Sequence, residues 1–237
     1  MDRDEYDFWL LDLDGTLVDV EQSYIYDVFE QVADRLEMSF TDRETELLWY
    51  GIGTARDELL AENNIDPVEF WQVFHEVENP ETRAQSTYLY DDAESFVPEL
   101  TGPVGVVTHC QKYLTGPVLD ELDIGDWFDT VVCCTDETGW KPDPGPVELA
   151  MSHLGVGTNG HTGVLVGDDP QDIGAAQNAG LESVHVRRRV YERLRPSLRD
   201  DGLFSSMGAD RRVSSLDELR LTDQTVTDVS PPVSEGE

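Results

Sequence analysis

The chain of 237 residues carries 16 Lys and Arg against 50 Asp and Glu, which gives a formal net charge of -34 at pH 7. Because phosphate backbones are bound by clustered cationic side chains, this acid excess argues against a nucleic-acid partner. The acidic first residues do not match the basic end of a signal peptide, no apolar stretch approaches the roughly 20 residues of a membrane span, and three cysteines without a C-x-x-C pattern indicate neither disulfides nor zinc. We therefore expect a cytoplasmic protein without a membrane partner.

Five short apolar runs, each bounded by turn residues, predict buried strands. In chain order they are Phe8 to Leu11, Val104 to Val107, Val131 to Cys134, Gly163 to Val166 and Val184 to Val186. Segments with helical periodicity, for example residues 113–122 and 146–154, lie between most of them. Strands that alternate with helices indicate a parallel sheet covered on both faces. We predict a three-layer α/β fold with a Rossmann-like core.

The interval between the first two predicted strands shows helical signals only. Apolar residues repeat at helical spacing over residues 25–36. Thr41 and Glu44 form the pattern of a capping box, and Asp66 followed by Pro67 marks the start of another helix. We predict three or four helices here, which form a small domain inserted into the α/β domain.

These signals divide the chain into three parts. The α/β core comprises residues 1–17 and 92–222, and the inserted helical domain comprises residues 18–91. Residues 223–237 combine Ser, Thr, Pro and acidic residues without periodicity, so we predict a disordered acidic tail.

Polar residues follow the predicted strands where each strand ends. The first strand runs into Asp12-Leu13-Asp14-Gly15-Thr16, and the second runs into Thr108. The third is followed by Trp140-Lys141-Pro142-Asp143-Pro144, and the fourth by Gly167-Asp168-Asp169-Pro170-Gln171-Asp172. The carboxyl ends of parallel strands share one edge, where open α/β sheets bind their ligands. A solvated acidic turn is the alternative for Asp12 and Asp14 taken alone.

In this order the four segments resemble the motifs of the haloacid dehalogenase-like hydrolase superfamily: D-x-D-G-T, a Thr at a strand end, K-P-x-P and G-D-x-x-x-D. Residues 173–180, with the sequence IGAAQNAG, look like the helix that follows the fourth motif in phosphoglycolate-phosphatase-like members. The helical insert is similar to their cap domain. The resemblance covers about residues 6–220 and implies a phosphate-ester hydrolase.

The resemblance also implies roles for the acidic residues. Asp12 would be the nucleophile that forms an aspartyl phosphate, and Asp14 the acid that protonates the leaving oxygen and then activates water. Mg²⁺ would be bound by Asp12, the backbone carbonyl of Asp14 and the side chain of Asp168, because a phosphate substrate and oxygen ligands favour this cation. Asp172 would support the metal waters or the motif lysine. Asp169 precedes Pro170 as an ideal N-cap residue, and a second metal-binding role for it stays open.

Three further residues are candidates for binding the substrate. Lys141 is one of only two lysines, and a compact ammonium at this place would hold the aspartate and the phosphoryl group together. Thr108 would contact the phosphate, although it could instead cap a helix. Arg56 follows the Gly51-Ile52-Gly53 segment and is a candidate for recognising the leaving group, with a solvated helix face as the alternative.

We predict a Mg²⁺-dependent phosphatase, a monomer or small homo-oligomer, that acts on a small phosphorylated metabolite, with phosphoglycolate as the best single guess. One alternative is a phosphoglucomutase-like phosphoryl transferase. Such an enzyme would usually carry a histidine shortly after the first motif, where this chain has residues 19–23, DVEQS. The other alternative is a binding module without catalysis that keeps the fold.

The acid excess itself predicts the cellular setting. Lysine occurs only at Lys112 and Lys141, and this pattern is similar to that of proteins from salt-accumulating cytoplasms. Molar salt shortens the Debye length to roughly 3 Å, which screens the repulsion among carboxylates. We therefore predict a halophilic protein that loses stability at low salt.

Overall fold

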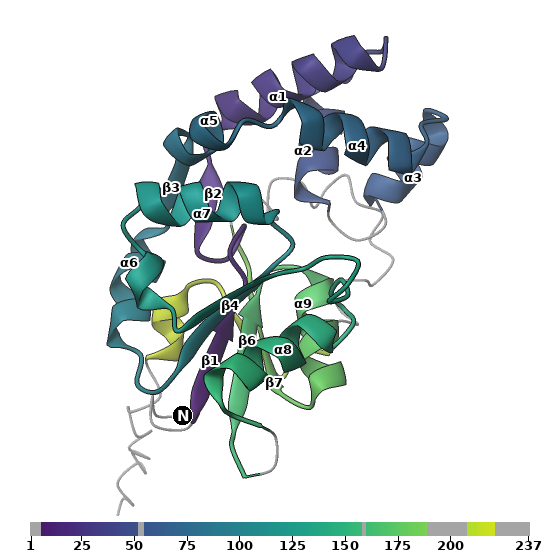
Figure 1. Ribbon diagram of the computed structural model, residues 1–237. Coiled ribbons are helices and arrows are strands. Elements are labelled where there is room, and N and C mark those ends of the chain that lie inside the picture. Colours follow the sequence, from purple (N-terminus) through teal and green to yellow (C-terminus); the bar gives the residue numbers. More distant parts are fainter. Residues whose placement is uncertain (1–5, 52–54, 158–159, 189–207, 221–237) are drawn as a thin grey trace, which may run out of the picture.

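The computed structural model describes residues 6–51, 55–157, 160–188 and 208–220 (Figure 1). Its main sheet is parallel, with the strand order β5-β4-β1-β6-β7-β8. The strands are β1 (Phe8–Leu11), β4 (Val104–Thr108), β5 (Thr130–Cys133), β6 (Gly163–Gly167), β7 (Glu182–Val186) and β8 (Arg211–Val213). The predicted α/β sheet is therefore confirmed. The strand β8 was not predicted, and the predicted tail, residues 223–237, lies outside the described residues.

The first strand explains how the sheet is covered on both faces. Phe8 and Leu10 belong to one apolar cluster, which also contains residues of α8 (Gly145–Leu154) and α9 (Pro170–Ala179). Trp9 and Leu11 point the other way, into a cluster with residues of α6 (Asp91–Phe96) and α7 (Lys112–Glu121). Alternate side chains of a strand face opposite sides of the sheet. An uninterrupted apolar run such as FWLL therefore fits a strand with a helical layer on each side.

The described part of the α/β body also contains the short 3-10 turns η2 (Val97–Glu99), η3 (Gly125–Trp127) and η5 (Leu216–Leu219). The start of α9 follows the sequence pattern closely. Asp169 is the N-cap residue and accepts a hydrogen bond from the backbone of Gln171, while the side chain of Asp172 accepts one from the backbone of Asp169. The predicted N-cap role of Asp169 is confirmed.

The helices of residues 22–85, called the helical block below, are grouped at one end of the sheet (Figure 1). They are α1 (Gln22–Arg35), α2 (Asp42–Tyr50), α3 (Ala55–Glu62), α4 (Pro67–Val77) and α5 (Pro80–Gln85). The block has its own apolar cluster, in which the rings of Phe29, Phe70 and Phe74 meet. The capping box of Thr41 with Glu44 and the N-cap role of Asp66 are both formed as predicted.

The chain enters and leaves the helical block through two strands that lie side by side. They are β2 (Val18–Val20) and β3 (Thr87–Leu89), which pair antiparallel with Asp19 opposite Tyr88. The sequence did not predict this small sheet, because three-residue strands are too short to show periodicity. Within the described residues, none of the helices has the length and apolarity that crossing a membrane would require.

Candidate active site

A lysine lies between two carboxylates at the carboxyl edge of the parallel sheet. Lys141 Nζ donates hydrogen bonds to Asp12 Oδ1 at 2.7 Å, to Asp172 Oδ1 at 2.6 Å and to the carbonyl of Val107 at 3.0 Å. The lysine comes from the loop after β5, while Asp12 directly follows β1 and Asp172 lies in the first turn of α9. All three side chains are buried. The fold therefore brings Asp12 and Lys141, which are 129 positions apart in the sequence, into one ion-pair network with Asp172.

Burial and ion pairing act on these groups in opposite directions. Burial raises the pKa of Asp12, because a charged carboxylate is costly away from water, and the ammonium of Lys141 opposes this effect. Burial by itself lowers the pKa of Lys141, but the carboxylates of Asp12 and Asp172 outweigh it and raise that pKa well above its usual range. The lysine is therefore a permanent positive charge beside Asp12.

Both carboxylate oxygens of Asp172 are held by hydrogen bonds, one of them with Lys141. One of its oxygens accepts the hydrogen bond from Lys141, and the other accepts from the backbone of Asp169 at 3.0 Å. A Cβ atom at position 167 would overlap the Asp172 carboxylate, so Gly167 is required where β6 ends. The structure thus places Asp172 in direct contact with the lysine, and its supporting role stays a prediction.

Three carboxylates at the sheet edge come close enough to share one cation. One oxygen from each of Asp12, Asp168 and Asp172 lies within 4.8 Å of the others. Both oxygens of Asp172 already accept hydrogen bonds, so Asp12 and Asp168 are the two carboxylates that fit a hard divalent cation. Thr16 Oγ1 donates to Asp168 at 3.3 Å. Gly15, at φ 78°, leaves room for the Asp168 carboxylate, which a Cβ atom there would overlap.

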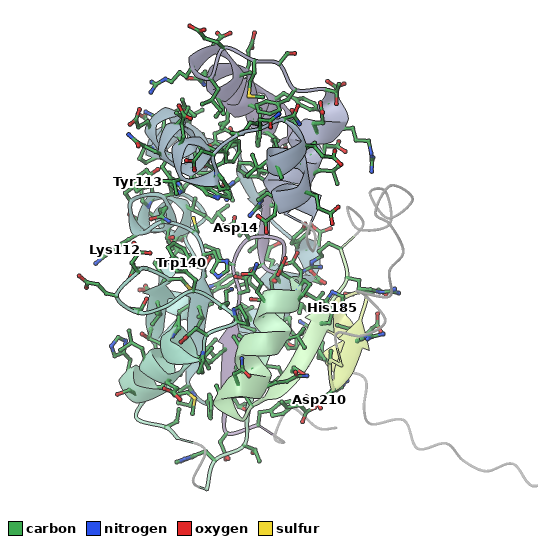
Figure 2. The ribbon with its side chains drawn as sticks, turned by 90° about the vertical axis from the view of Figure 1, so that its right-hand side faces the viewer. Asp14, Lys112, Tyr113, Trp140, His185 and Asp210 are labelled. Atoms are coloured by element: carbon green, nitrogen blue, oxygen red, sulfur yellow. The ribbon has the colours of Figure 1, made fainter. Side chains whose placement is uncertain are left out.

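The side chain of Asp14 points away from this cluster and toward the helical block. Its carboxylate forms an ion pair with Arg83 of α5, whose guanidinium is buried. Figure 2 shows Asp14 at the level where the helical block meets the α/β body. The sequence analysis missed Arg83, since nothing in the local pattern of residues 80–85 distinguishes it from an exposed helical arginine. Only the tertiary contact reveals its position.

A cavity of about 230 Å³ lies between the helical block and the sheet edge. The α/β body contributes the ion-pair network, Asp14, Asp168 and Thr108 to its lining, together with His109 and Cys110. The helical block contributes Arg56, Arg83, Glu78 and several aromatic side chains, among them Trp49 and Trp71. Every residue predicted from sequence to take part in the site therefore lines one cavity.

Comparisons with known proteins agree with this geometry. The sequence profile described as haloacid dehalogenase-like hydrolase matches residues 9–186. The chain belongs to this family. It is 28% identical over 179 residues to a pyrophosphatase of Bacillus velezensis, with 75% of this chain and 81% of that protein covered. It is 29% identical over 186 residues to a phosphoglycolate phosphatase of Photorhabdus laumondii, with 73% and 76% covered.

A solved haloacid dehalogenase-like family hydrolase from Streptococcus pneumoniae matches the structure with a TM-score of 0.70 and 15% identity, covering 91% of this chain and 97% of that chain. At this identity the likeness shows the fold alone. The family resemblance predicted from the four motifs is confirmed, and the fold is that of haloacid dehalogenase-like hydrolases.

Thr108, one of the residues predicted to bind substrate, lines the cavity of this haloacid dehalogenase-like hydrolase. It is buried, and its hydroxyl accepts a hydrogen bond from the backbone of Cys110 at 3.0 Å. This bond leaves the hydroxyl hydrogen available as a donor.

Arg56 does not lie on a solvated helix face. It donates to the carbonyls of Leu48 and Trp49, at 2.8 and 2.9 Å, and its guanidinium lies 4.8 Å from the centre of the Trp71 ring.

His109 was not predicted as a site residue. Its ring meets that of Trp140 edge to face at 5.6 Å. Burial, helped by the nearby Lys141 charge, lowers the pKa of His109 to about 4, so the imidazole is neutral near pH 7. The sequence contains no pattern that distinguishes His109 from an ordinary histidine in a loop, so it could not be predicted as a site residue.

Proposed function

We propose that this protein is a Mg²⁺-dependent phosphatase that hydrolyses a small phosphate ester through an aspartyl phosphate on Asp12. The observation that carries the proposal is the buried network in which Lys141 joins Asp12 to Asp172 at the sheet edge. A carboxylate held by a fixed ammonium can attack phosphorus without losing its position. The same ammonium offsets the charge of the transferring phosphoryl oxygens.

Two other residues complete the proposed chemistry. Thr108 lines the cavity at the end of β4, from where its hydroxyl donates a hydrogen bond to a phosphoryl oxygen. Asp14 lies two residues after the proposed nucleophile; once released from Arg83, it takes up a proton from solvent and donates it to the leaving oxygen. In the second half of the reaction the same carboxylate takes a proton from the water that attacks the aspartyl phosphate.

The carboxylates of Asp12 and Asp168, with the backbone carbonyl of Asp14, would hold the Mg²⁺ ion. This assignment is supported by the close approach of carboxylate oxygens at the sheet edge. When bound, Mg²⁺ supplies positive charge that stabilises the phosphoryl group during transfer. The chain's own contribution is to orient the two carboxylates: Lys141 donates to Asp12, and Thr16 donates to Asp168, for which Gly15 leaves room.

We further propose that residues 18–91 are a cap that covers the site and contacts the leaving group. Support comes from the cavity itself, since one of its walls belongs to the helical block. Phosphoglycolate is the first substrate to test, because a curated relative carries the name phosphoglycolate phosphatase. Pyrophosphate is the second, because another relative is named a pyrophosphatase.

The central experiment is acid quench of the reaction after short mixing with substrate, followed by peptide mass spectrometry. We expect a phosphate adduct on the peptide that contains Asp12. The Asp12→Asn variant should show no adduct and no turnover while it keeps the circular dichroism spectrum of the wild type. EDTA should abolish turnover, and excess Mg²⁺ should restore it. Turnover of Asp12→Asn near the wild-type rate would refute the nucleophile.

The composition supports a cellular setting for this activity. We propose that the protein works in a salt-rich cytoplasm, because a net charge of -34 with only two lysines is best tolerated where molar cations screen the carboxylates. The activity assays should therefore be run in multimolar KCl.

A further inference from the structure

The cavity wall formed by the helical block contains an arginine with an unusual environment. Arg83 is only 2% exposed, although arginine side chains normally reach solvent. Its guanidinium carbon lies 5.5 Å from the centre of the Trp49 ring and 5.8 Å from that of Tyr24. Aromatic faces attract a cation at such distances. The rings therefore hold the positive charge of Arg83 at the cavity, away from the surface.

One of the two terminal nitrogens of Arg83 is without a hydrogen-bond partner. Its Nη2 donates to Asp14, but Nη1 is buried and has no acceptor in the part of the chain that the structure describes. Buried polar groups are nearly always paired, and a charged donor is especially costly to leave unpaired. Because Arg83 lines the cavity, a ligand in the cavity can supply the acceptor that the protein does not.

The other charged groups of this wall are already engaged. Arg56 uses two of its donors on backbone carbonyls of α2. Glu78 accepts a hydrogen bond from the Tyr24 hydroxyl at 3.3 Å, and His75 Nδ1 lies 3.7 Å from its other oxygen. Among the described arginine and lysine side chains on this side of the cavity, Arg83 is the one with a buried nitrogen that has no hydrogen-bond partner.

We propose that Arg83 binds an anionic substituent of the leaving group, so that the substrates are phosphate esters or anhydrides whose leaving group carries a carboxylate or a second phosphate. This inference rests on the proposed phosphatase function and names its substrate class. Both anions present paired oxygens that match the parallel donors of a guanidinium. An anion that binds both Nη1 and Nη2 of Arg83 replaces Asp14 as the partner of Nη2. The released Asp14 carboxylate can then take up a proton from solvent and pass it to the leaving oxygen, so anion binding and release of the acid are coupled.

The competing explanation is that Arg83 acts only on Asp14 and never contacts substrate. Both explanations predict a slower enzyme when Arg83 is replaced. They differ in the substrates whose kcat/KM falls, because a residue that only positions Asp14 affects every substrate whose leaving group needs a proton. A residue that binds the anion affects only those substrates that carry one.

The test uses three substrates in Mg²⁺ and 2 M KCl: phosphoglycolate, pyrophosphate and 2-hydroxyethyl phosphate. The third has an alcohol in place of the carboxylate of phosphoglycolate, and is otherwise the same. Removal of the charge in Arg83→Met should lower kcat/KM for at least one anionic substrate about 10- to 100-fold more than for 2-hydroxyethyl phosphate. Whichever anionic substrate shows the selective loss identifies the anion as carboxylate or phosphate.

The control is Arg35→Met, which removes a cation from the exposed side of α1, where Arg35 pairs with Glu76. It should leave all three kcat/KM values unchanged. If Arg83→Met loses its circular dichroism spectrum, Arg83→Lys is measured instead, and a selective loss of about 3- to 10-fold is expected, because one ammonium cannot reproduce the paired donors.

Equal losses on all three substrates, or no loss, would overturn the inference. So would a wild-type enzyme that cleaves 2-hydroxyethyl phosphate, whose leaving group is uncharged, at least as well as both substrates whose leaving group is an anion. Failure of the phosphatase function would look different, because the wild type would then cleave none of the three and no activated aryl phosphate either.

Discussion

Replacing Lys141 by methionine should damage stability and catalysis through separable causes. The ammonium has three hydrogen-bond acceptors, and its removal leaves the carboxylates of Asp12 and Asp172 buried without their cation. Breaking a buried ion pair from one side costs about 3–5 kcal/mol. For a domain of this size about 1 kcal/mol corresponds to roughly 2–4 °C, so Lys141→Met should melt about 6–20 °C below the wild type.

The melting temperature should be measured in EDTA and 2 M KCl, because a bound divalent cation would replace the missing charge. Lys112→Met is the matched control, since Lys112 is the other lysine of the chain and is exposed at the start of α7. It should melt with the wild type. Figure 2 shows Lys112 at the surface.

The double variant Lys141→Met with Asp172→Asn separates the two causes. It removes one of the two uncompensated charges and should recover about half of the lost stability. Turnover should stay about 10²- to 10³-fold or more below the wild type, because the charge beside Asp12 is still absent. A Lys141→Met protein that melts within about 2 °C of the wild type would refute the reasoning about buried charge.

Three further predictions concern proton transfer, pH and salt. Asp14→Asn should lose about 10²- to 10⁴-fold in kcat on alkyl phosphates and far less on an activated aryl phosphate, whose leaving group needs little protonation; equal losses would remove Asp14 from the acid role. The pKa of His109 is lowered by burial to about 4, so the unfolded chain binds a proton first as the pH falls. The free energy of unfolding should therefore decrease from about pH 6.5 to pH 4, by about 3 kcal/mol from this group. His109→Asn should lose that part of the pH dependence, whereas the exposed His161→Asn should retain it. Finally, the melting temperature should fall between 2 M and 0.01 M KCl, as the Debye length grows to about 30 Å, and Mg²⁺ should delay the loss; an unchanged value would contradict the link between the acid excess and a salt-rich setting.

The sequence was sufficient to predict secondary structure where a local pattern of residues is typical of one element. An apolar run of four residues that is bounded by turn residues, such as FWLL, is too short for a typical helix and fits a buried strand, and it was located to the residue. Asp66 before Pro67 is equally unambiguous as a helix start. The strand β8 was missed because Val213 is the one apolar residue of its three, so neither alternation nor an apolar run is present.

Site residues could be predicted to lie close together where they stand at the carboxyl ends of neighbouring parallel strands. Asp12 and Asp168 directly follow β1 and β6, and Thr108 is the last residue of β4; because these three parallel strands are neighbours, their ends lie together. Lys141 is separated from its strand by a loop, and its place was predicted from its neighbouring prolines and the scarcity of lysine. Scarcity alone would not have distinguished Lys141 from Lys112, which is exposed, so the neighbouring prolines were needed as well.

Arg83 illustrates the opposite case, in which the decisive contact has no local signature. Nothing in its helix predicts burial, because its partners lie elsewhere in the chain: Tyr24 on α1, Trp49 on α2 and Asp14 in the loop after β1. Such a residue is determined by how the helical block packs on the sheet edge, which depends on all of these elements at once. Motifs of the α/β body place the proposed reacting groups within a few residues of each strand end. The groups proposed to select the leaving group lie in an inserted block that meets those strand ends only in three dimensions, so the sequence alone predicts the former and not the latter.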